Sequence, residues 1–270
     1  MITSTQNPKL KLVSGLLGRP KERREAGAFV AEGVRLVEEA LAAAWPFRFA
    51  LYSPELTRRG HELVDKLSAA GVDLEPVSEN LMQTISETET SQGILAVLSL
   101  TNLPIPNLPT FILIPDSIRD PGNLGSLLRT AAAAGVQAVF LPPETTDAFA
   151  PKVVRAGMGA HFRLPIASMT WEEIERFSDS ASQRASESAQ LKVFLADMEG
   201  QSCWEADFRR PLALIVGGEA EGASQEARKL ANRQVRIPMP GGAESLNAAI
   251  AGAILMFEIV RQRTETRSHP

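Results

Sequence analysis

The residues best suited to chemistry lie in one stretch near the middle of the chain. A short apolar run, residues 111–114, ends in a polar turn and leads into a segment rich in Leu and Ala, which predicts a strand, a loop and the start of a helix. The loop carries Asp116 and Asp120, and Asn123 and Arg129 follow around the helix start. An arginine among small apolar residues is costly if its face of the helix is buried, so we expect Arg129 to have a function.

A glycine-rich loop follows a later predicted strand. Residues 217–222 are Gly-Gly-Glu-Ala-Glu-Gly, which matches neither G-x-G-x-x-G nor a glycine followed by Lys and Ser or Thr, the patterns that hold phosphates. The carboxylates of Glu219 and Glu221 would repel a phosphate. A cofactor with a positive sulfonium centre fits this loop better than a nucleoside triphosphate.

A second such loop, residues 237–242, contains glycines that permit a ligand to approach the backbone closely. Ser245 is predicted to cap the helix that follows, with Asn247 in the first turn. All three loops come directly after predicted strands. In open α/β sheets this edge is where ligands bind.

Strands alternate with helices throughout the second half of the chain. The alternation predicts an α/β fold in which a mostly parallel sheet has both faces covered. The clearest strands are predicted at residues 111–114, 138–141, 192–196 and 212–216. A long apolar helix is predicted from about residue 246 to 260.

The first hundred residues form a separate, smaller α/β unit in this interpretation. Prolines within residues 101–110 favour an extended linker, so we predict domains at 1–100 and 111–270. The first 25 residues carry six basic side chains, all within residues 9–24, against two acidic ones. The basic segment could neutralise phosphates of a nucleic acid or form a solvated helix face, and the sequence leaves both alternatives open.

Composition narrows the class of protein. The chain has 270 residues, 44% of them hydrophobic, and a net charge of −4, values typical of a globular protein. Cys203 is the only cysteine and there are three histidines, so the sequence predicts neither a disulfide nor a metal site. No apolar run is long enough to span a membrane, and the N-terminus lacks the apolar core of a signal peptide. We therefore expect a cytoplasmic protein.

Three blocks of the chain resemble, in order and spacing, the three motifs of the SpoU, or TrmH-like, RNA 2′-O-ribose methyltransferases of the SPOUT superfamily. The blocks are residues 116–131 (Asp-Ser-Ile-Arg-Asp-Pro-Gly-Asn-Leu-Gly-Ser-Leu-Leu-Arg-Thr-Ala), 214–222 (Leu-Ile-Val-Gly-Gly-Glu-Ala-Glu-Gly) and 237–247 (Ile-Pro-Met-Pro-Gly-Gly-Ala-Glu-Ser-Leu-Asn). The departures, at Gly218, Ala220 and the two alanines after Asn247, exchange small residues for small ones. Residues 1–100 resemble the family's N-terminal RNA-binding domain, a type shared with a ribosomal protein.

The resemblance implies a knotted catalytic domain that binds S-adenosylmethionine and works as a homodimer, with the active site near the dimer interface. A deep knot would be an exception to the rule that chains do not thread loops. The cofactor positions of the family fall on residues of the second and third loops, namely Gly217, Gly218, Ile237, Met239 and Leu246.

The catalytic residues that the resemblance implies are Arg129, Asn123, Glu219, Ser245 and Asn247. A guanidinium with a pKa above about 12 is a poor free base. We therefore expect Arg129 to position a phosphate or the 2′-hydroxyl, while water or a substrate phosphate accepts the proton. Asn123 would orient the ribose or hold Arg129, and the other three would complete the polar network.

Other functions stay open at this point. The chain could be an RNA-binding or ribosome-assembly protein without catalysis, or a methyltransferase that modifies a base. The spacing of Asn123 and Arg129 favours the ribose. Within the family, both transfer RNA and large-subunit ribosomal RNA are substrates. A separate N-terminal domain favours ribosomal RNA.

Overall fold

A computed structural model describes residues 1–87, 91–184, 190–218 and 222–265. The chain divides into two compact units. The first comprises Met1–Thr101 together with Asp147–Phe162, and the second comprises Asn102–Thr146 together with Arg163–Pro270. Within the described ranges, no helix has the length and apolar character needed to cross a membrane.

The first unit is built on a four-stranded mixed sheet. Its strand order is β1-β4-β2-β3, in which β4 runs antiparallel to both neighbours and β2 pairs with β3 in parallel. The strands are β1 (Ala28–Glu32), β2 (Phe47–Tyr52), β3 (Leu74–Pro76) and β4 (Ile94–Ser99). The helices are α1 (Pro8–Gly18), α2 (Pro20–Ala26), α3 (Val34–Ala42), α4 (Arg58–Ala69), α5 (Glu79–Ile85) and α7 (Pro151–Gly157), with a 3₁₀ turn at Ala160–Phe162.

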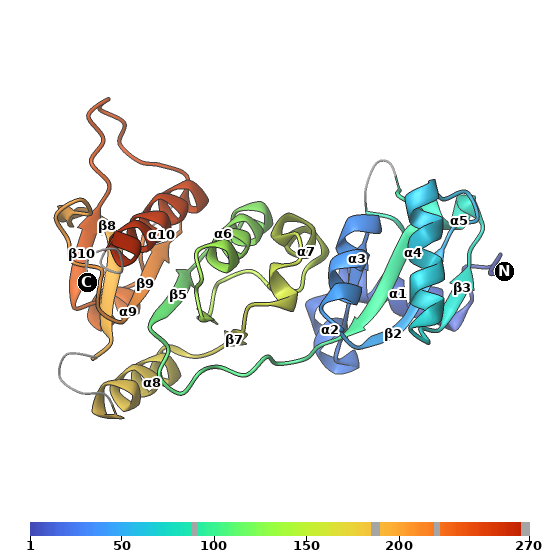
Figure 1. Ribbon diagram of the computed structural model, residues 1–270, viewed down its shortest axis with the longest axis horizontal. Helices are drawn as coiled ribbons and strands as arrows, with labels where there is room; N and C mark the ends of the chain where they lie inside the picture. The colour runs from blue at the N-terminus through green and yellow to red at the C-terminus, as the bar shows by residue number, and fades with distance from the viewer. Residues whose placement is uncertain (88–90, 185–189, 219–221, 266–270) are drawn as a thin grey trace. The chain divides into compact units, whose positions relative to one another are not determined.

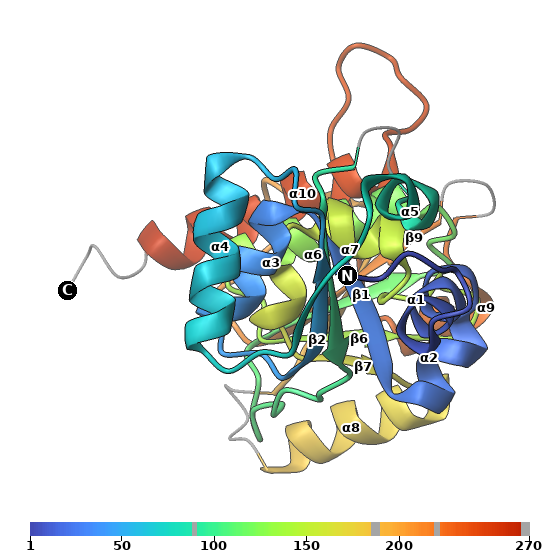
Figure 2. The same cartoon turned by 90° about the vertical axis from the view of Figure 1, so that its right-hand side faces the viewer.

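Helices cover both faces of this sheet. Leucines of α1 and Met82 of α5 join the strand residues of one core, while α3 and α4 lie on the opposite side (Figure 2). The segment 147–162 lies within the range expected for the second domain, yet it groups with the first unit. The ring of Phe29 explains this grouping, because it packs 5.0 Å from Phe149 and 6.4 Å from Phe162 between centroids.

Two cations of the basic segment 9–24, Lys9 and Arg23, are held by carboxylates of the first unit. Lys9 lies 2.6 Å from Asp73 and 2.7 Å from Glu75. Arg23 is 3% exposed, and its guanidinium donates to Asp147 at 2.7 Å. The phosphate-binding alternative is therefore wrong for Arg23, because this cation is buried against a carboxylate.

The second unit is a six-stranded sheet in which every pair of neighbouring strands is parallel. The strand order is β10-β8-β9-β5-β6-β7. The strands are β5 (Phe111–Asp116), β6 (Ala138–Leu141), β7 (Ile166–Ser168), β8 (Lys192–Ser202), β9 (Leu212–Gly217) and β10 (Arg233–Arg236). The helices are α6 (Pro121–Ala133), α8 (Trp171–Arg184), α9 (Gln225–Leu230) and α10 (Ala248–Glu265).

Two layers of helices enclose this sheet (Figure 1). Ile174 of α8 and Ala227 of α9 pack with Ile112 and Ile114 of β5, whereas α6 and α10 pack together over β5 and β9. The predicted fold class, α/β with a parallel sheet and a smaller N-terminal α/β unit, is confirmed. The chain runs from β5 toward β7 and then returns to the other side, so the direction of winding reverses between β5 and β9. Such a reversal is where open α/β sheets bind ligands.

Candidate active site

The first chemical loop leaves the sheet at the end of β5. Asp116 is fully buried there, and the chain turns through Ser117, which has a left-handed φ of 56°. Asp120 caps α6 by accepting a hydrogen bond from the backbone N–H of Asn123 at 2.8 Å. This cap fixes Asn123 in the first turn of the helix.

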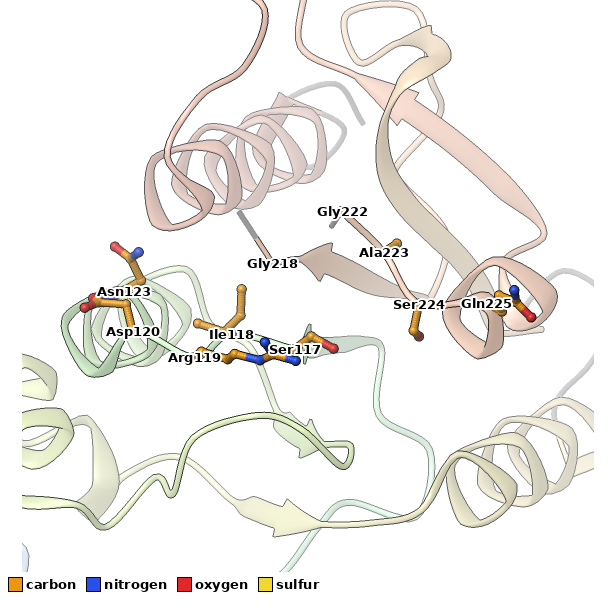
Figure 3. Close-up of a pocket in the computed structure, with 10 residues that line it drawn as sticks. All are labelled: Ser117, Ile118, Arg119, Asp120, Asn123, Gly218, Gly222, Ala223, Ser224 and Gln225. Atoms are coloured by element: carbon orange, nitrogen blue, oxygen red, sulfur yellow. The ribbon is translucent and has the colours of Figure 1, made fainter. Parts of the chain in front are cut away.

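A buried carboxylate ties this loop to the second one. Asp116 accepts from the backbone N–H of Ser224 at 2.6 Å and from the hydroxyl of Ser117 at 3.1 Å. A Cβ on Gly218 would lie 2.6 Å from the carbonyl oxygen of Ser117, so the two loops touch backbone to backbone. A cavity of about 370 Å³ lies between them. Figure 3 shows Asn123 on one side of it and Ser224 on the other.

The third loop joins the first through two amide side chains. Asn247 donates from Nδ2 to Oδ1 of Asn123 at 2.9 Å. The Oδ1 atom of Asn247 accepts from the backbone N–H groups of Ala249 at 3.0 Å and Ile250 at 3.2 Å. Asn247 is therefore the N-cap of α10. The prediction that Ser245 caps this helix is wrong, because Ser245 lies outside the first turn.

A larger cavity of about 730 Å³ adjoins the first and shares Gly218 and Gly222 with it. Val216, Leu255 and Ala251 give it an apolar side. It brings together all of the predicted cofactor residues and two of the predicted catalytic ones, namely Gly217, Gly218, Ile237, Met239, Leu246, Ser245 and Asn247.

One wall of the larger cavity was not predicted. It is formed by residues 196–199, by Arg228 and by Arg236. Arg228 forms an ion pair with Asp197 at 2.6 Å. The sequence could have indicated this wall, because residue 196 ends a predicted strand of the same sheet and ligands bind at the ends of such strands.

The wall exists because β8 leaves its partner strand and then returns to it. Gln234 pairs with Leu195, but Val235 pairs with Gln201, so the residues between them bulge toward the cavity. A Cβ on Gly200 would lie 2.4 Å from backbone atoms of β10. Only glycine fits where the bulge passes this strand.

Two predicted catalytic residues are not placed in either cavity. Arg129 is exposed on α6 and lines neither one, and it forms no ion pair among the residues that the structure describes. Glu219 lies outside the described residues. Their proposed roles stay predictions.

The larger cavity suits the cofactor that the loops predict. Its volume falls within the range of roughly 300–1,000 Å³ typical of small-molecule sites. Apolar side chains can cover an adenine ring, and the backbone of Gly217, Gly218 and Gly222, which line the cavity, can supply hydrogen bonds. Asp197, Glu199 and Arg228 offer charged partners for an amino acid group and a sulfonium.

Comparison with known families decides the identity. Residues 110–257 match the SpoU rRNA Methylase family, and residues 7–96 match the MRM3-like substrate binding domain. The chain belongs to the SpoU rRNA methylase family. The recognised resemblance and the predicted enzyme class are thereby confirmed.

Other SpoU methylases resemble this chain along nearly its whole length. It is 34% identical to the 23S rRNA (guanosine(2553)-2′-O)-methyltransferase RlmP of Bacillus subtilis, over 96% of this chain and 98% of that protein. The crystal structure of the SpoU methyltransferase AviRb from Streptomyces viridochromogenes in complex with the cofactor AdoMet has a TM-score of 0.86. That comparison gives 30% identity and covers 96% of this chain and 99% of the other. An AdoMet-bound rRNA methyltransferase from Sinorhizobium meliloti has a TM-score of 0.82, at 32% identity and with 96% and 97% coverage. The predicted cofactor, S-adenosylmethionine, agrees with both complexes.

Proposed function

We propose that this SpoU methylase transfers a methyl group from S-adenosylmethionine to a ribose 2′-hydroxyl of RNA, with large-subunit ribosomal RNA as its substrate in the cytoplasm. The observation that carries the proposal is the hydrogen bond between Asn123 and Asn247. It joins the loop with the Asn and Arg spacing typical of ribose methylation to the cavity that the predicted cofactor residues line. The relatives named as 23S rRNA 2′-O-methyltransferases support the same substrate class.

The bound cofactor supplies an electrophilic methyl group on a sulfonium. The residues of the chain must align the hydroxyl with that group and exclude competing water. Asn123 and Asn247 fix the rim between the two cavities, and their amides orient the ribose. His161 belongs to the first unit and not to these loops, so we do not assign it the role of base. In this mechanism water or a substrate phosphate takes the proton, while Arg129 positions the phosphate beside the hydroxyl.

Labelled methyl transfer tests this proposal. With unmodified ribosomal and transfer RNA as acceptors, we expect a 2′-O-methylated nucleoside in ribosomal RNA. Arg129→Ala should lower the transfer rate by about 100-fold or more, because it removes a charge that positions the reacting groups, with cofactor affinity unchanged. Arg176→Ala, at another exposed arginine on a helix of the same unit, is the matched control.

The same experiment separates the alternatives. If the methyl group is found on a base, the enzyme is a base methyltransferase and not a ribose methyltransferase. If transfer RNA is the only acceptor, the substrate is transfer RNA and not ribosomal RNA. Cofactor binding without transfer to either RNA would favour a non-catalytic RNA-binding or assembly protein. Equal rates for Arg129→Ala and Arg176→Ala would remove Arg129 from the mechanism.

We also propose that two copies pair through the outer face of α10. Ile250 and Phe257 are 54% and 51% exposed and lie two turns apart, so they form one apolar stripe. The opposite face of α10 is buried through Leu255 and Met256. Because Arg129 does not line the cavities of its own chain, an active site near the interface between two copies accounts for its predicted role.

Replacing Phe257 by glutamate should shift the protein from dimer to monomer and lower methyl transfer in parallel. A charge at the centre of an apolar interface costs several kcal/mol of association free energy. Sedimentation velocity measures the assembly state. Leu108→Glu, at an exposed leucine of the same unit, is the control that should leave it unchanged. A Phe257→Glu protein that stays dimeric would contradict this interface.

A further inference from the structure

An exposed tryptophan stands at the carboxyl end of β8. Trp204 is 52% exposed, and within the described part of the chain its indole has no ring or cation partner. Its backbone is well held, since its N–H donates to Oγ of Ser202 at 3.3 Å and the preceding Cys203 is fully buried. The fold therefore fixes the main chain here and leaves a large aromatic surface available for contact with a ligand.

Arg236 of the edge strand β10 lies beside this tryptophan. The backbone N–H of Cys203 donates to the carbonyl of Arg236 at 2.9 Å, which places Trp204 next to Arg236. Arg233 lies at the start of the same strand. Both arginines are exposed, and neither forms an ion pair among the residues that the structure describes. Glu199 and Glu205 occur nearby in the sequence but do not pair with them.

This pair stands on the edge of the sheet where the reaction takes place. All six strands are parallel, so their carboxyl ends share one edge. The order β10-β8-β9-β5 puts the carboxyl ends of these four strands in succession along that edge (Figure 1), and Arg236 and Gly217 are the last residues of β10 and β9. Neighbouring strands lie about 4.8 Å apart, so β8 lies roughly 10 Å from β5 across the sheet. Arg236 also lines the larger cavity.

We propose that Trp204 and Arg236 form a binding subsite for a single-stranded nucleotide next to the one that is methylated. The indole stacks on the base, and the guanidinium binds the phosphate. This inference rests on the proposed function, because it needs an RNA at the cavity. A second copy of the chain fits less well, since two arginine-bearing edges would repel each other and α10 already offers an apolar face.

Binding of a fluorescein-labelled, single-stranded 12-nucleotide RNA, followed by fluorescence anisotropy, tests the subsite. Trp204→Ala should weaken binding about 10-fold at every salt concentration, whereas Trp204→Phe, which keeps an aromatic ring, should stay within about threefold. Arg236→Ala should weaken binding and reduce the slope of log affinity against log salt by about 0.7, the value for one phosphate contact. Arg209→Ala, at an exposed arginine paired with Asp207, is the charge control.

Methyl transfer to a large-subunit rRNA transcript gives the second readout. Trp204→Ala should raise KM about 10-fold with little change in kcat, and the affinity for S-adenosylmethionine measured by calorimetry should equal that of the wild type. Unchanged RNA affinity in Trp204→Ala would overturn the proposal. Equal losses of RNA affinity in Trp204→Ala and Trp204→Phe would also overturn it, because they would indicate a structural role for the tryptophan. A shift of the monomer–dimer equilibrium without a change in RNA binding would assign the surface to a second copy.

The two levels of inference fail in different ways. If the wild type methylates no RNA, the proposed function is wrong and the subsite fails with it. If the wild type binds and methylates RNA while both Trp204→Ala and Arg236→Ala behave like it, only the subsite is wrong.

Discussion

A Gly200→Ala variant is expected to lose cofactor binding and to unfold more easily. The added Cβ would lie 2.4 Å from the carbonyl carbon of Gln234 and the nitrogen of Val235, and 2.7 Å from the carbonyl oxygen of Gln234. These are backbone atoms of β10, which pairs with β8 on both sides of the bulge, so they cannot rotate away. Relief requires the two strands to separate. Overpacking of this kind costs about 3 kcal/mol.

The expected loss of cofactor affinity follows from the position of the bulge beside the larger cavity. Residues 196–199 form a wall of the larger cavity, and Gly200 is the point at which the chain returns to β10. Displacing that point moves Asp197 and its ion pair with Arg228. We therefore expect the affinity for S-adenosylmethionine to fall by at least about 10-fold, which corresponds to about 1.4 kcal/mol.

Calorimetric titration with S-adenosylmethionine and urea unfolding measure the two effects. Gly18→Ala is the matched control, because Gly18 lies in the first unit and a Cβ there would meet nothing within 4 Å. It should bind and unfold like the wild type. If the Gly200 and Gly18 variants are indistinguishable, the close approach of the two strands does not hold the cavity wall.

Gly200 also shows where prediction from the sequence ends. The sequence predicts a strand at 192–196, whereas β8 extends to Ser202 after a bulge. Residues 197–201 are Asp-Met-Glu-Gly-Gln, a polar stretch without the alternation of a strand. What makes it part of a strand is its pairing with β10, more than thirty residues later, and a single sequence does not reveal such pairing.

The parts that were predicted depend on local signals. Buried runs such as β5 and β9 are short, apolar and bounded by Gly, Pro and Asp, and the three loops follow such runs directly. The spacing within each loop is also local. The predicted cofactor positions, which the resemblance to the family implies, all line one cavity, although the sequence does not show how the loops meet.

Features that depend on contacts between distant parts of the chain were not predictable in the same way. Both Ser245 and Asn247 are good capping residues, and only the start of α10 at Ala248 decides between them. The grouping of 147–162 with the first unit depends on aromatic side chains, Phe149 and Phe162, whose partners lie over a hundred residues earlier. Apolar periodicity identifies a buried face but does not name its partner.

The second large effect that we expect is a loss of stability of the first unit in mild acid, caused by His161. Burial lowers the pKa of its imidazole to about 4, although Ala148 and Asp147 oppose the shift. The Nε2 atom donates to the carbonyl of Ala148 at 2.8 Å, and Nδ1 is buried without a partner among the described residues. Protonation would place an unsatisfied, charged N–H group in the core beside Phe149.

The direction of the effect follows from proton binding. An unfolded histidine has a pKa of about 6.5, so between pH 6.5 and pH 4 the unfolded chain binds a proton that the folded unit excludes. The contribution of His161 to the free energy of unfolding should therefore be constant above about pH 6.5 and fall as the pH drops toward 4. The full loss is roughly 3 kcal/mol, at about 1.4 kcal/mol for each pKa unit.

Hydrogen exchange of the amides in α7 and the following turn, measured from pH 7.5 to pH 4, reports the stability of this unit without requiring two-state unfolding of the whole chain. Carboxylates also titrate in this range, so the wild type alone does not isolate His161. His161→Gln keeps an N–H donor for Ala148 but does not titrate, and it should lose the part of the pH dependence that His161 causes. His61→Gln, at an exposed histidine of the same unit, should retain it. The contradicting outcome is an identical pH profile of stability for the wild type and His161→Gln. It would mean that His161 takes up its proton in the folded unit as readily as in the unfolded chain. The buried Nδ1 atom would then need a hydrogen-bond partner.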